Sequence, residues 1–146
     1  MALIIVTGPP ASGKSTWVRD HARPNDIVID YDVLAQALSG PGADTHRHGK
    51  QVRSVAHQAR STAIAQALRY VSVVDVYIIH TEPQAEAVAK YRRHQARWVT
   101  IDPGRDVVML RCRELRSPHT LRVVEDWYAT QASRSLNVNA SSSREW

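Results

Sequence analysis

A glycine-rich segment near the N-terminus carries the residue types that bind a triphosphate. It matches the pattern G-x-x-x-x-G-K-[ST], with glycine at Gly8 and Gly13. Glycine permits backbone angles that turn successive N–H groups toward a phosphate. In this pattern Lys14 reaches the β- and γ-phosphates of ATP, and the Ser15 hydroxyl binds Mg²⁺. We therefore expect ATP to bind at Gly8, Pro9, Pro10, Ala11, Ser12, Gly13, Lys14, Ser15 and Thr16.

Two aspartates form a second candidate group. Asp30 and Asp32 follow the short apolar run Ile27–Ile29, which predicts a strand. Ligands of a doubly wound sheet gather beyond the carboxyl ends of its strands, so both carboxylates are expected near the phosphates. A carboxylate there can orient and deprotonate an acceptor hydroxyl, and we assign this catalytic role to Asp32. For Asp30, Mg²⁺ binding, helix capping and catalysis all remain open, and capping is also the alternative for Asp32.

Arginines near the C-terminal end form a third candidate group, which consists of Arg111, Arg113 and Arg116. Phosphoryl transfer spreads negative charge over the equatorial oxygens, and an arginine can neutralise that charge. The spacing puts Arg113 and Arg116 on one helix face and Arg111 on another. We treat all three as catalytic candidates, with an ordinary solvated helix face as the alternative.

The elements that must position these groups alternate along the chain. Apolar, β-branched runs predict strands, and the segments between them predict helices. The alternation predicts a three-layer α/β fold with a mainly parallel sheet of four or five strands. We expect one P-loop domain over residues 1–132 and a disordered, polar tail over residues 133–146. The strands are predicted at Ala2–Thr7, Ile27–Ile29, Asp75–His80 and Trp98–Ile101. The helices are predicted at Thr16–Ala22, from Val33, at Lys50–Tyr70, Gln84–Gln95 and Arg105–Arg116, and from Ser117 to about Ala132.

Composition limits the class of protein. The chain has 146 residues, of which 43% are hydrophobic, enough for one domain with a core. No apolar run approaches the length of a membrane span, so we expect no membrane partner. The single cysteine, Cys112, excludes an internal disulfide framework and a cysteine-cluster metal site, and fits a reducing, cytoplasmic setting. The net charge of +5 favours a polyanionic partner such as nucleic acid, although a general arginine bias would also produce it.

The predicted helix over Lys50–Tyr70 has an apolar and a basic face. A basic face could follow a phosphate backbone or could simply be solvated. The apolar face is expected to comprise Val52, Val55, Ala59 and Ala63. The basic face comprises Lys50, Arg53, His57 and Arg60.

Three tryptophans are predicted to lie in the core, namely Trp17, Trp98 and Trp127.

Two stretches, GPPASGKSTWVR and VIDYDVLAQAL, resemble the kinase domain of phage-type 5′-hydroxyl polynucleotide kinases. The resemblance covers most of residues 2–130 and is closest in these two motifs. It implies a P-loop kinase fold, ATP and Mg²⁺ as cofactors, and a nucleic acid as phosphate acceptor. It also implies that Asp32 is the general base for the 5′-hydroxyl. The Arg-rich segment up to Arg116 falls on the family's lid, whose arginines hold the ATP phosphates.

Two other interpretations stay open. The Asp30-Tyr31-Asp32 run also resembles small-metabolite kinases such as shikimate kinase, so the acceptor could be a nucleotide or another small hydroxyl compound. The chain could instead be a P-loop ATPase or accessory protein. That class needs an acid at the end of the third predicted strand, where this chain has His80, with Glu82 two residues later. We therefore favour a phosphotransferase over an ATPase.

Overall fold

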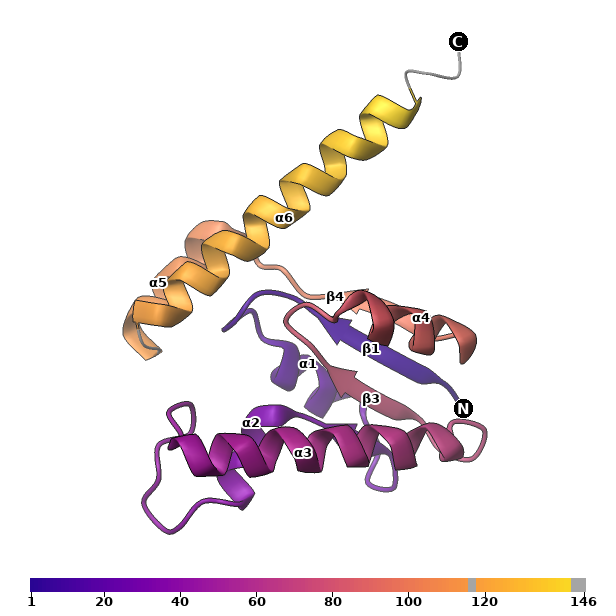
Figure 1. The fold of residues 1–146 in the computed structure, drawn as a ribbon, viewed down its shortest axis with the longest axis vertical. Coiled ribbons are helices and arrows are strands. Elements are labelled where there is room, and N and C mark those ends of the chain that lie inside the picture. The colour runs from indigo at the N-terminus through magenta and orange to yellow at the C-terminus, as the bar shows by residue number, and fades with distance from the viewer. Residues whose placement is uncertain (116–117, 143–146) are drawn as a thin grey trace. The chain divides into compact units, whose positions relative to one another are not determined.

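A four-stranded, all-parallel sheet organises the protein in this computed structural model, which describes residues 1–115 and 118–142. The strand order is β2-β3-β1-β4, and Figure 1 shows β1 beside β3. In register, Ile5 of β1 lies opposite Ile78 of β3 and Trp98 of β4. The predicted α/β fold with a parallel sheet is confirmed. The strands are β1 (Leu3–Thr7), β2 (Ile27–Ile29), β3 (Val76–Ile79) and β4 (Arg97–Thr100).

The chain divides into two compact units. The first comprises Met1–Gly8 and Gly13–Ile101, and the second comprises Pro9–Ser12 and the chain from Asp102 onward. The first unit contains the sheet and the helices α1 (Lys14–His21), α2 (Tyr31–Ala37), α3 (Lys50–Ala67) and α4 (Ala85–Arg93), with a 3₁₀ turn η1 (Leu68–Tyr70) after α3. The second unit contains α5 (Arg105–Leu115) and α6 (Pro118–Ser142).

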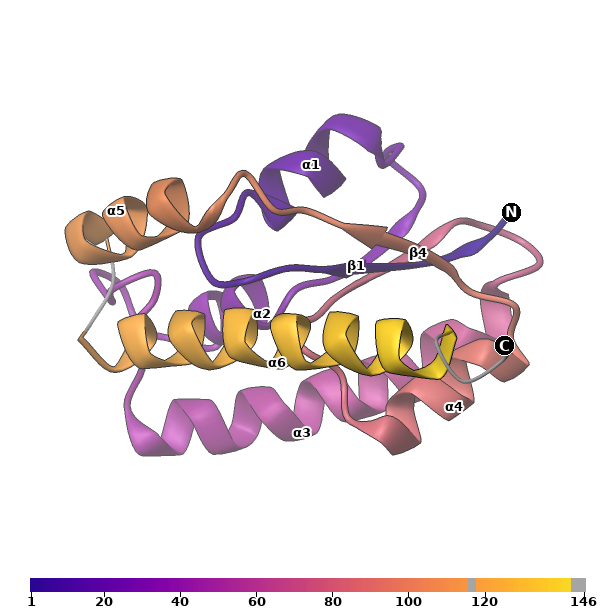
Figure 2. The same cartoon turned by 90° about the horizontal axis from the view of Figure 1, so that it is seen from above.

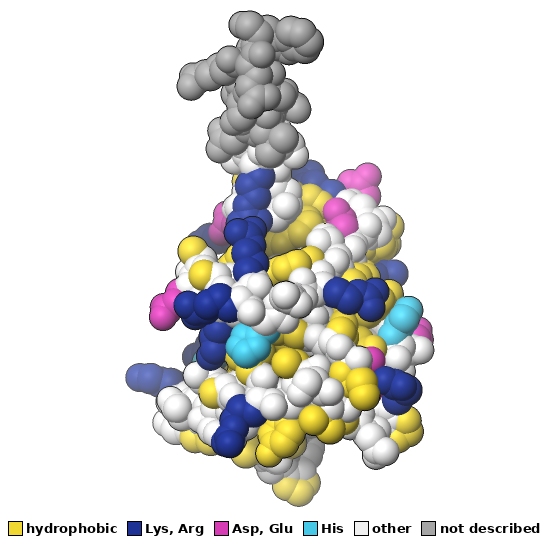
Figure 3. Space-filling model, turned by 90° about the vertical axis from the view of Figure 1, so that its right-hand side faces the viewer, with side chains coloured by type: hydrophobic (Ala, Val, Ile, Leu, Met, Phe, Trp, Pro, Cys, Tyr) yellow, Lys and Arg dark blue, Asp and Glu magenta, His cyan; other side chains and the backbone are white. Residues whose placement is uncertain are grey.

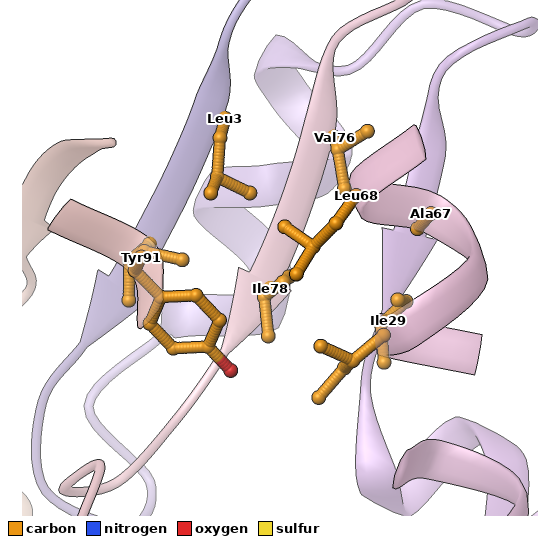
Figure 4. Packing of buried hydrophobic residues seen from close by; sticks show 9 residues of the cluster. Leu3, Ile29, Ala67, Leu68, Val76, Ile78 and Tyr91 are labelled. Atoms are coloured by element: carbon orange, nitrogen blue, oxygen red, sulfur yellow. The ribbon is translucent and has the colours of Figure 1, made fainter. Parts of the chain in front are cut away.

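Helices cover both faces of the sheet in the first unit. Alternate strand residues point to opposite faces, so neighbours in β1 enter different cores. Leu3 and Ile5 pack with the α3 residue Ile64 and the α4 residue Tyr91, whereas Ile4 packs in the cluster that holds Val18 of α1. Figure 2 shows α1 on one side of the sheet and α3 and α4 on the other. Figure 4 shows the α3/α4 side, where Tyr91 lies near Ile78.

The face of helix α3 that packs inward is not the face predicted from the sequence. Val55, expected in the core, is 55% exposed, whereas Ala56, Ile64 and Ala67 are buried. The side of α3 that packs inward runs through positions 56, 60 and 64, with Ala56 and Ile64 buried and Arg60 partly buried. Their four-residue spacing places them on one face. Arg60 lies on this side and is partly buried, whereas Lys50, Arg53 and His57 of the predicted basic face are exposed.

The tryptophans have different environments. Trp127 is buried in the second unit, and Trp17 packs partly buried against the α1 side of the sheet. Trp98, in contrast, is 40% exposed, so its assignment to the core is wrong. The reason is its strand: β4 lies at the edge of the sheet, and its residues are covered less than those of β1 and β3. Trp98 still keeps a ring contact with Tyr91, at 6.3 Å between centroids.

The last helix extends beyond its predicted end. We expected a helix to about Ala132, but α6 continues to Ser142. The added segment contains neither glycine nor proline, so nothing in its sequence breaks the helix. Residues 143–146 lie outside the described part of the chain. Within residues 1–115 and 118–142, no helix combines the length and apolar character that a membrane crossing requires.

Candidate active site

The predicted phosphate-binding loop joins β1 to α1 and has an unusual backbone. Gly8, Ala11 and Gly13 all adopt positive φ, at 151°, 59° and 100°. A Cβ on Gly13 would meet no atom within 4 Å, so glycine is needed there for its backbone angles and not for lack of space. Ala11 carries the cost of a left-handed conformation, of the kind that clusters at ligand-binding loops. The loop is thus held in the form that its motif predicts.

Three features of the loop fit a bound phosphate. The Lys14 Nζ donates a 2.8 Å hydrogen bond to the Gly8 carbonyl, so the ammonium folds back over the loop. Helix α1 begins without a side-chain cap and without an acid in its first turn, which leaves its positive end for an anion. The Ser12 Oγ is buried and has no hydrogen-bond partner in the described chain. A buried unpaired hydroxyl is costly, and a phosphate oxygen would satisfy it.

Asp30 links the carboxyl end of β2 to the phosphate-binding motif. Its Oδ2 accepts a 2.5 Å hydrogen bond from the Ser15 hydroxyl. Its Oδ1 accepts a 3.0 Å bond from the Asp32 backbone N–H and so caps α2. Asp30 is thus both the helix cap and a partner of the predicted Mg²⁺ ligand. These hard oxygen donors are of the kind that Mg²⁺ binds, so the residues fit the ion.

Asp32 lies in the first turn of α2, and its side chain is 37% exposed. The Nδ1 of His46 approaches its Oδ2 at 3.5 Å. His46 is held there by the turn at Asp44, whose Oδ1 accepts hydrogen bonds from the His46 and Arg47 N–H groups. The turn-rich segment between α2 and α3 therefore folds against the candidate base. Sequence patterns gave no sign of this contact, because it depends on how the loop closes.

Tyr31 and His57 form a stacked pair beside Asp32. Their ring centroids are 4.6 Å apart, with 29° between the ring planes. Burial raises the pKa of Tyr31, and the nearby positive charge of Arg53 partly opposes that shift. Lys50, Arg53 and His57 are exposed on α3, so the basic face is retained at these three positions. Aromatic rings and basic side chains thus lie next to the candidate base.

Arg60 continues the basic face of α3 toward the end of β3. Its Nη2 donates a 2.7 Å hydrogen bond to the carbonyl of Ile79, the last residue of β3. Burial lowers the pKa of Arg60, and the nearby Tyr91 and Asp30 oppose the shift. The placement of Arg60 was missed from the sequence. The signal that could have found it is the four-residue spacing from Ala56 and Ile64, two residues of the core.

His80 follows β3 directly and is a structural residue in this arrangement. One ring nitrogen, Nε2, is 2.8 Å from the Tyr91 hydroxyl. Burial, together with the positive charge of Arg60, lowers the pKa of His80 from 6.5 to about 4. His80 is therefore neutral at pH 7 and cannot take the place of an acidic residue at the end of this strand.

In the second unit, α5 contacts the segment Pro9–Ser12. Arg111 Nη1 donates a 3.2 Å hydrogen bond to the Ala11 carbonyl, and the Cys112 thiol is 3.7 Å from the Pro10 carbonyl oxygen. Cys112 is buried in a small core with Val108 and Val124. Of the three candidate arginines, Arg111 thus contacts the segment Pro9–Ser12, and both Arg111 and Arg113 are exposed on α5. Arg116 lies outside the described residues.

Comparisons with known proteins agree with this fold. A family model described as an AAA domain matches residues 3–134. A solved structure of a "putative kinase" from Chloroflexus aurantiacus is similar with a TM-score of 0.60 and 21% sequence identity. The match covers 84% of this chain and 77% of that one. A comparison with curated proteins finds no match. At this identity the structural similarity supports the fold, and the chemistry must be argued from the residues.

Proposed function

Because the chain belongs to the AAA_33 family of AAA domains, we propose that its P-loop carries out ATP- and Mg²⁺-dependent phosphoryl transfer. The proposed acceptor is a hydroxyl group, specifically the 5′-hydroxyl of a polynucleotide. One contact carries the proposal: Asp30 bonds to Ser15 while Asp32 lies two residues further on. In this arrangement Asp30 contacts Ser15, the expected Mg²⁺ ligand, and Asp32 is proposed to act on the acceptor.

Each loop residue has a defined role in this reaction. Lys14 neutralises the β- and γ-phosphates, and the backbone N–H groups in the first turn of α1, which has no side-chain cap, bind the phosphate oxygens. Ser15 and Asp30 hold Mg²⁺, which when bound shields the negative charge of the triphosphate. Arg111, through its position against Ala11, neutralises charge on the transferring group. Arg113 and Arg116 remain candidates for that role.

Asp32 accepts the proton of the acceptor hydroxyl. The hydroxyl oxygen then forms a bond to the γ-phosphorus, and the bond to the oxygen bridging the β- and γ-phosphorus atoms breaks, so that ADP leaves. The contact of His46 with Asp32 holds that carboxylate in place beside the Tyr31–His57 pair. The proton, the phosphoryl group and the leaving group are thus all accounted for without a further reactant.

Two observations favour transfer over hydrolysis. The end of β3, where a hydrolysing ATPase needs an acid, bears the neutral His80 bonded to Tyr91. The side chain of Asp32 is 37% exposed, whereas Asp30 is buried and bonded to Ser15 and to the backbone of α2. Hydrolysis of ATP is the alternative reaction, so activity without an acceptor must be measured as well.

The exposed side of α3 supports a polynucleotide acceptor. Lys50, Arg53 and His57 lie exposed along it, and Tyr31 stacks on His57 next to Asp32. Basic side chains and aromatic faces together bind single-stranded nucleic acid by charge and by base stacking. Figure 3 shows further Lys and Arg side chains on the face that it draws. A smaller acceptor would need no such extended surface.

The test is transfer of labelled γ-phosphate from ATP with Mg²⁺ to a panel of acceptors. The panel contains 5′-hydroxyl DNA and RNA oligonucleotides, nucleosides, nucleoside monophosphates and a control without acceptor. We expect label on the oligonucleotide end and binding that weakens steeply with salt, because each phosphate contact releases counterions. If only a monomer is labelled, the acceptor is a small molecule and not a polynucleotide. If every reaction releases free phosphate, the result favours an ATPase.

A further inference from the structure

The segment that joins α2 to α3 turns back along α2. Near the end of the helix, the Gln36 Nε2 donates a 3.2 Å hydrogen bond to the Ala43 carbonyl. One helical turn earlier, the Nδ1 of His46 lies 3.5 Å from the Asp32 Oδ2. Positions 32 and 36 are four residues apart, so both contacts are on the same face of α2. The segment therefore runs from the end of α2 toward the candidate base at its start.

Asp44 fixes the backbone of the turn that brings His46 to this place. Its Oδ1 accepts a 2.7 Å hydrogen bond from the His46 N–H and a 2.9 Å bond from the Arg47 N–H. An aspartate that bonds to the backbone two and three residues further on closes a turn and limits the backbone angles within it. The hydrogen bond from the His46 N–H is the main cause that lowers the pKa of the Asp44 carboxyl, so the carboxylate is charged at pH 7. A charged acceptor makes both bonds stronger than a neutral one would.

The two sets of contacts form a chain from Asp44 to Asp32. Asp44 is exposed, and its Oδ1 bonds to the backbone of its own turn. His46 carries the effect further, because a fixed backbone leaves its short side chain few staggered positions. The ring then contacts one of the two oxygens of Asp32, whose side chain is 37% exposed. This contact favours one position of the carboxylate over the other staggered ones.

We propose that Asp44 is a positioning residue for phosphoryl transfer, which acts by holding the His46 ring against Asp32. The inference rests on the proposed function, in which Asp32 takes the proton of the acceptor hydroxyl. A general base must lie within hydrogen-bond reach of the proton that it removes. A displacement of about 1 Å, caused by a change far from the reacting atoms, can cost about 100-fold in rate. The 3.5 Å contact suits this role, because contacts of catalytic groups are often long before the substrate binds.

Stabilisation of a surface turn is the competing explanation. Asp44 would then matter for the folding of residues 38–49 and for nothing in the reaction. That role would lower thermal stability but would leave kcat unchanged in a folded variant. A positioning role lowers kcat, whereas the KM for ATP stays the same, because ATP is assigned to the separate loop over residues 8–16. The experiment must therefore measure kcat and the KM for ATP separately.

The variants are Asp44→Ala and Asp44→Asn, compared with the wild type by transfer of labelled γ-phosphate to the best acceptor of the panel. Asp44→Ala loses both backbone hydrogen bonds, and we expect its kcat to fall about tenfold with an unchanged KM for ATP. Asparagine has a side-chain oxygen that accepts the same two bonds, so Asp44→Asn should stay within about twofold of the wild type. Thr45→Ala is the matched control, because Thr45 is an exposed residue of the same turn, and it should keep the full kcat. Asp44→Ser has a weaker acceptor, should lose about threefold, and replaces Asp44→Ala if that variant does not fold.

A double-mutant cycle tests whether Asp44 acts through His46. His46→Ala removes the ring, so the further change Asp44→Ala should then reduce kcat by less than about twofold. The inference is overturned if a folded Asp44→Ala keeps the wild-type kcat, or if Asp44→Asn loses as much as Asp44→Ala. It is also overturned if the two losses multiply in the double variant. Failure of the proposed function looks different, because the wild type itself would then label no acceptor, which would overturn both.

Discussion

The Ser15 hydroxyl and the Asp30 carboxylate are joined by a 2.5 Å hydrogen bond, although the strands that lead to them are not neighbours. β3 lies between β1 and β2, so the side chain of Asp30 reaches the start of α1 past the end of β3. The contact brings the glycine-rich motif and the aspartate pair into one site.

Asp30→Asn should weaken the response to Mg²⁺ with little loss of stability. Asparagine can still cap α2, but it lacks the negative charge that favours the ion. We expect the Mg²⁺ concentration for half-maximal transfer to rise about tenfold, measured by a titration at saturating ATP. Asp30→Ala is the matched comparison, because it also loses the cap, and it should cost about 1 kcal/mol more in the free energy of unfolding. An unchanged Mg²⁺ titration in Asp30→Asn would remove Asp30 from the metal site.

Asp32→Asn should abolish transfer while leaving ATP binding intact. An amide cannot accept the proton of the acceptor hydroxyl, and general-base catalysis contributes roughly 10²–10⁴-fold. The measurements are the rate of label transfer and the affinity for ATP by calorimetry. Asp20→Asn, an exposed position on α1, is the control and should keep full activity. Full turnover of ATP by Asp32→Asn without an acceptor would support the ATPase interpretation instead.

Arg111→Gln should reduce the rate of transfer more than Arg113→Gln. Both side chains are exposed on α5, but Arg111 also bonds to the Ala11 carbonyl. Loss of a residue that neutralises charge in the transition state typically costs on the order of 100-fold in kcat. Both variants remove one positive charge, so the comparison separates a local role from a general effect of charge. Equal rates in the two variants would show that Arg111 has no special role.

The stability of the protein should fall in mild acid because of His80. Burial and the charge of Arg60 lower its pKa from 6.5 to about 4, so the unfolded chain binds the proton more readily than the folded chain. The contribution of neutral His80 is fully present above about pH 6.5 and is lost as the pH falls toward 4. The total loss of stability over this pH range is about 3 kcal/mol in the free energy of unfolding.

Urea unfolding at several pH values measures this effect. His80→Gln cannot titrate, so its stability should change less than that of the wild type between pH 6.5 and 4. Tyr91→Phe removes the hydrogen bond but keeps the burial, which is the main cause of the shift. It should therefore keep most of the wild-type slope. A wild-type slope in His80→Gln would assign the effect to other groups.

The local sequence was sufficient to predict the backbone conformation of the expected phosphate-binding loop. Its conformation depends on neighbouring residues, because Gly8 and Gly13 permit positive φ wherever they occur between a strand and a helix. The role of Asp30 as a helix cap was also predictable from the local sequence, since its bond to the Asp32 N–H spans only two residues. The apolar runs of the strands also predicted the parallel sheet, because a strand buried on both faces needs no alternating pattern.

Tertiary structure decided what surrounds the loop. The orientation of α3 could not be read from its sequence, because alanine, valine and serine lie all around the helix and give no clear apolar stripe. Contact with the sheet selects the face of Ala56 and Ile64, and it carries Arg60 inward to Ile79. Trp98 is exposed because β4 is an edge strand, which depends on the strand order. The bond between Ser15 and Asp30 likewise exists only once three strands are side by side, because it joins elements that no local pattern places together.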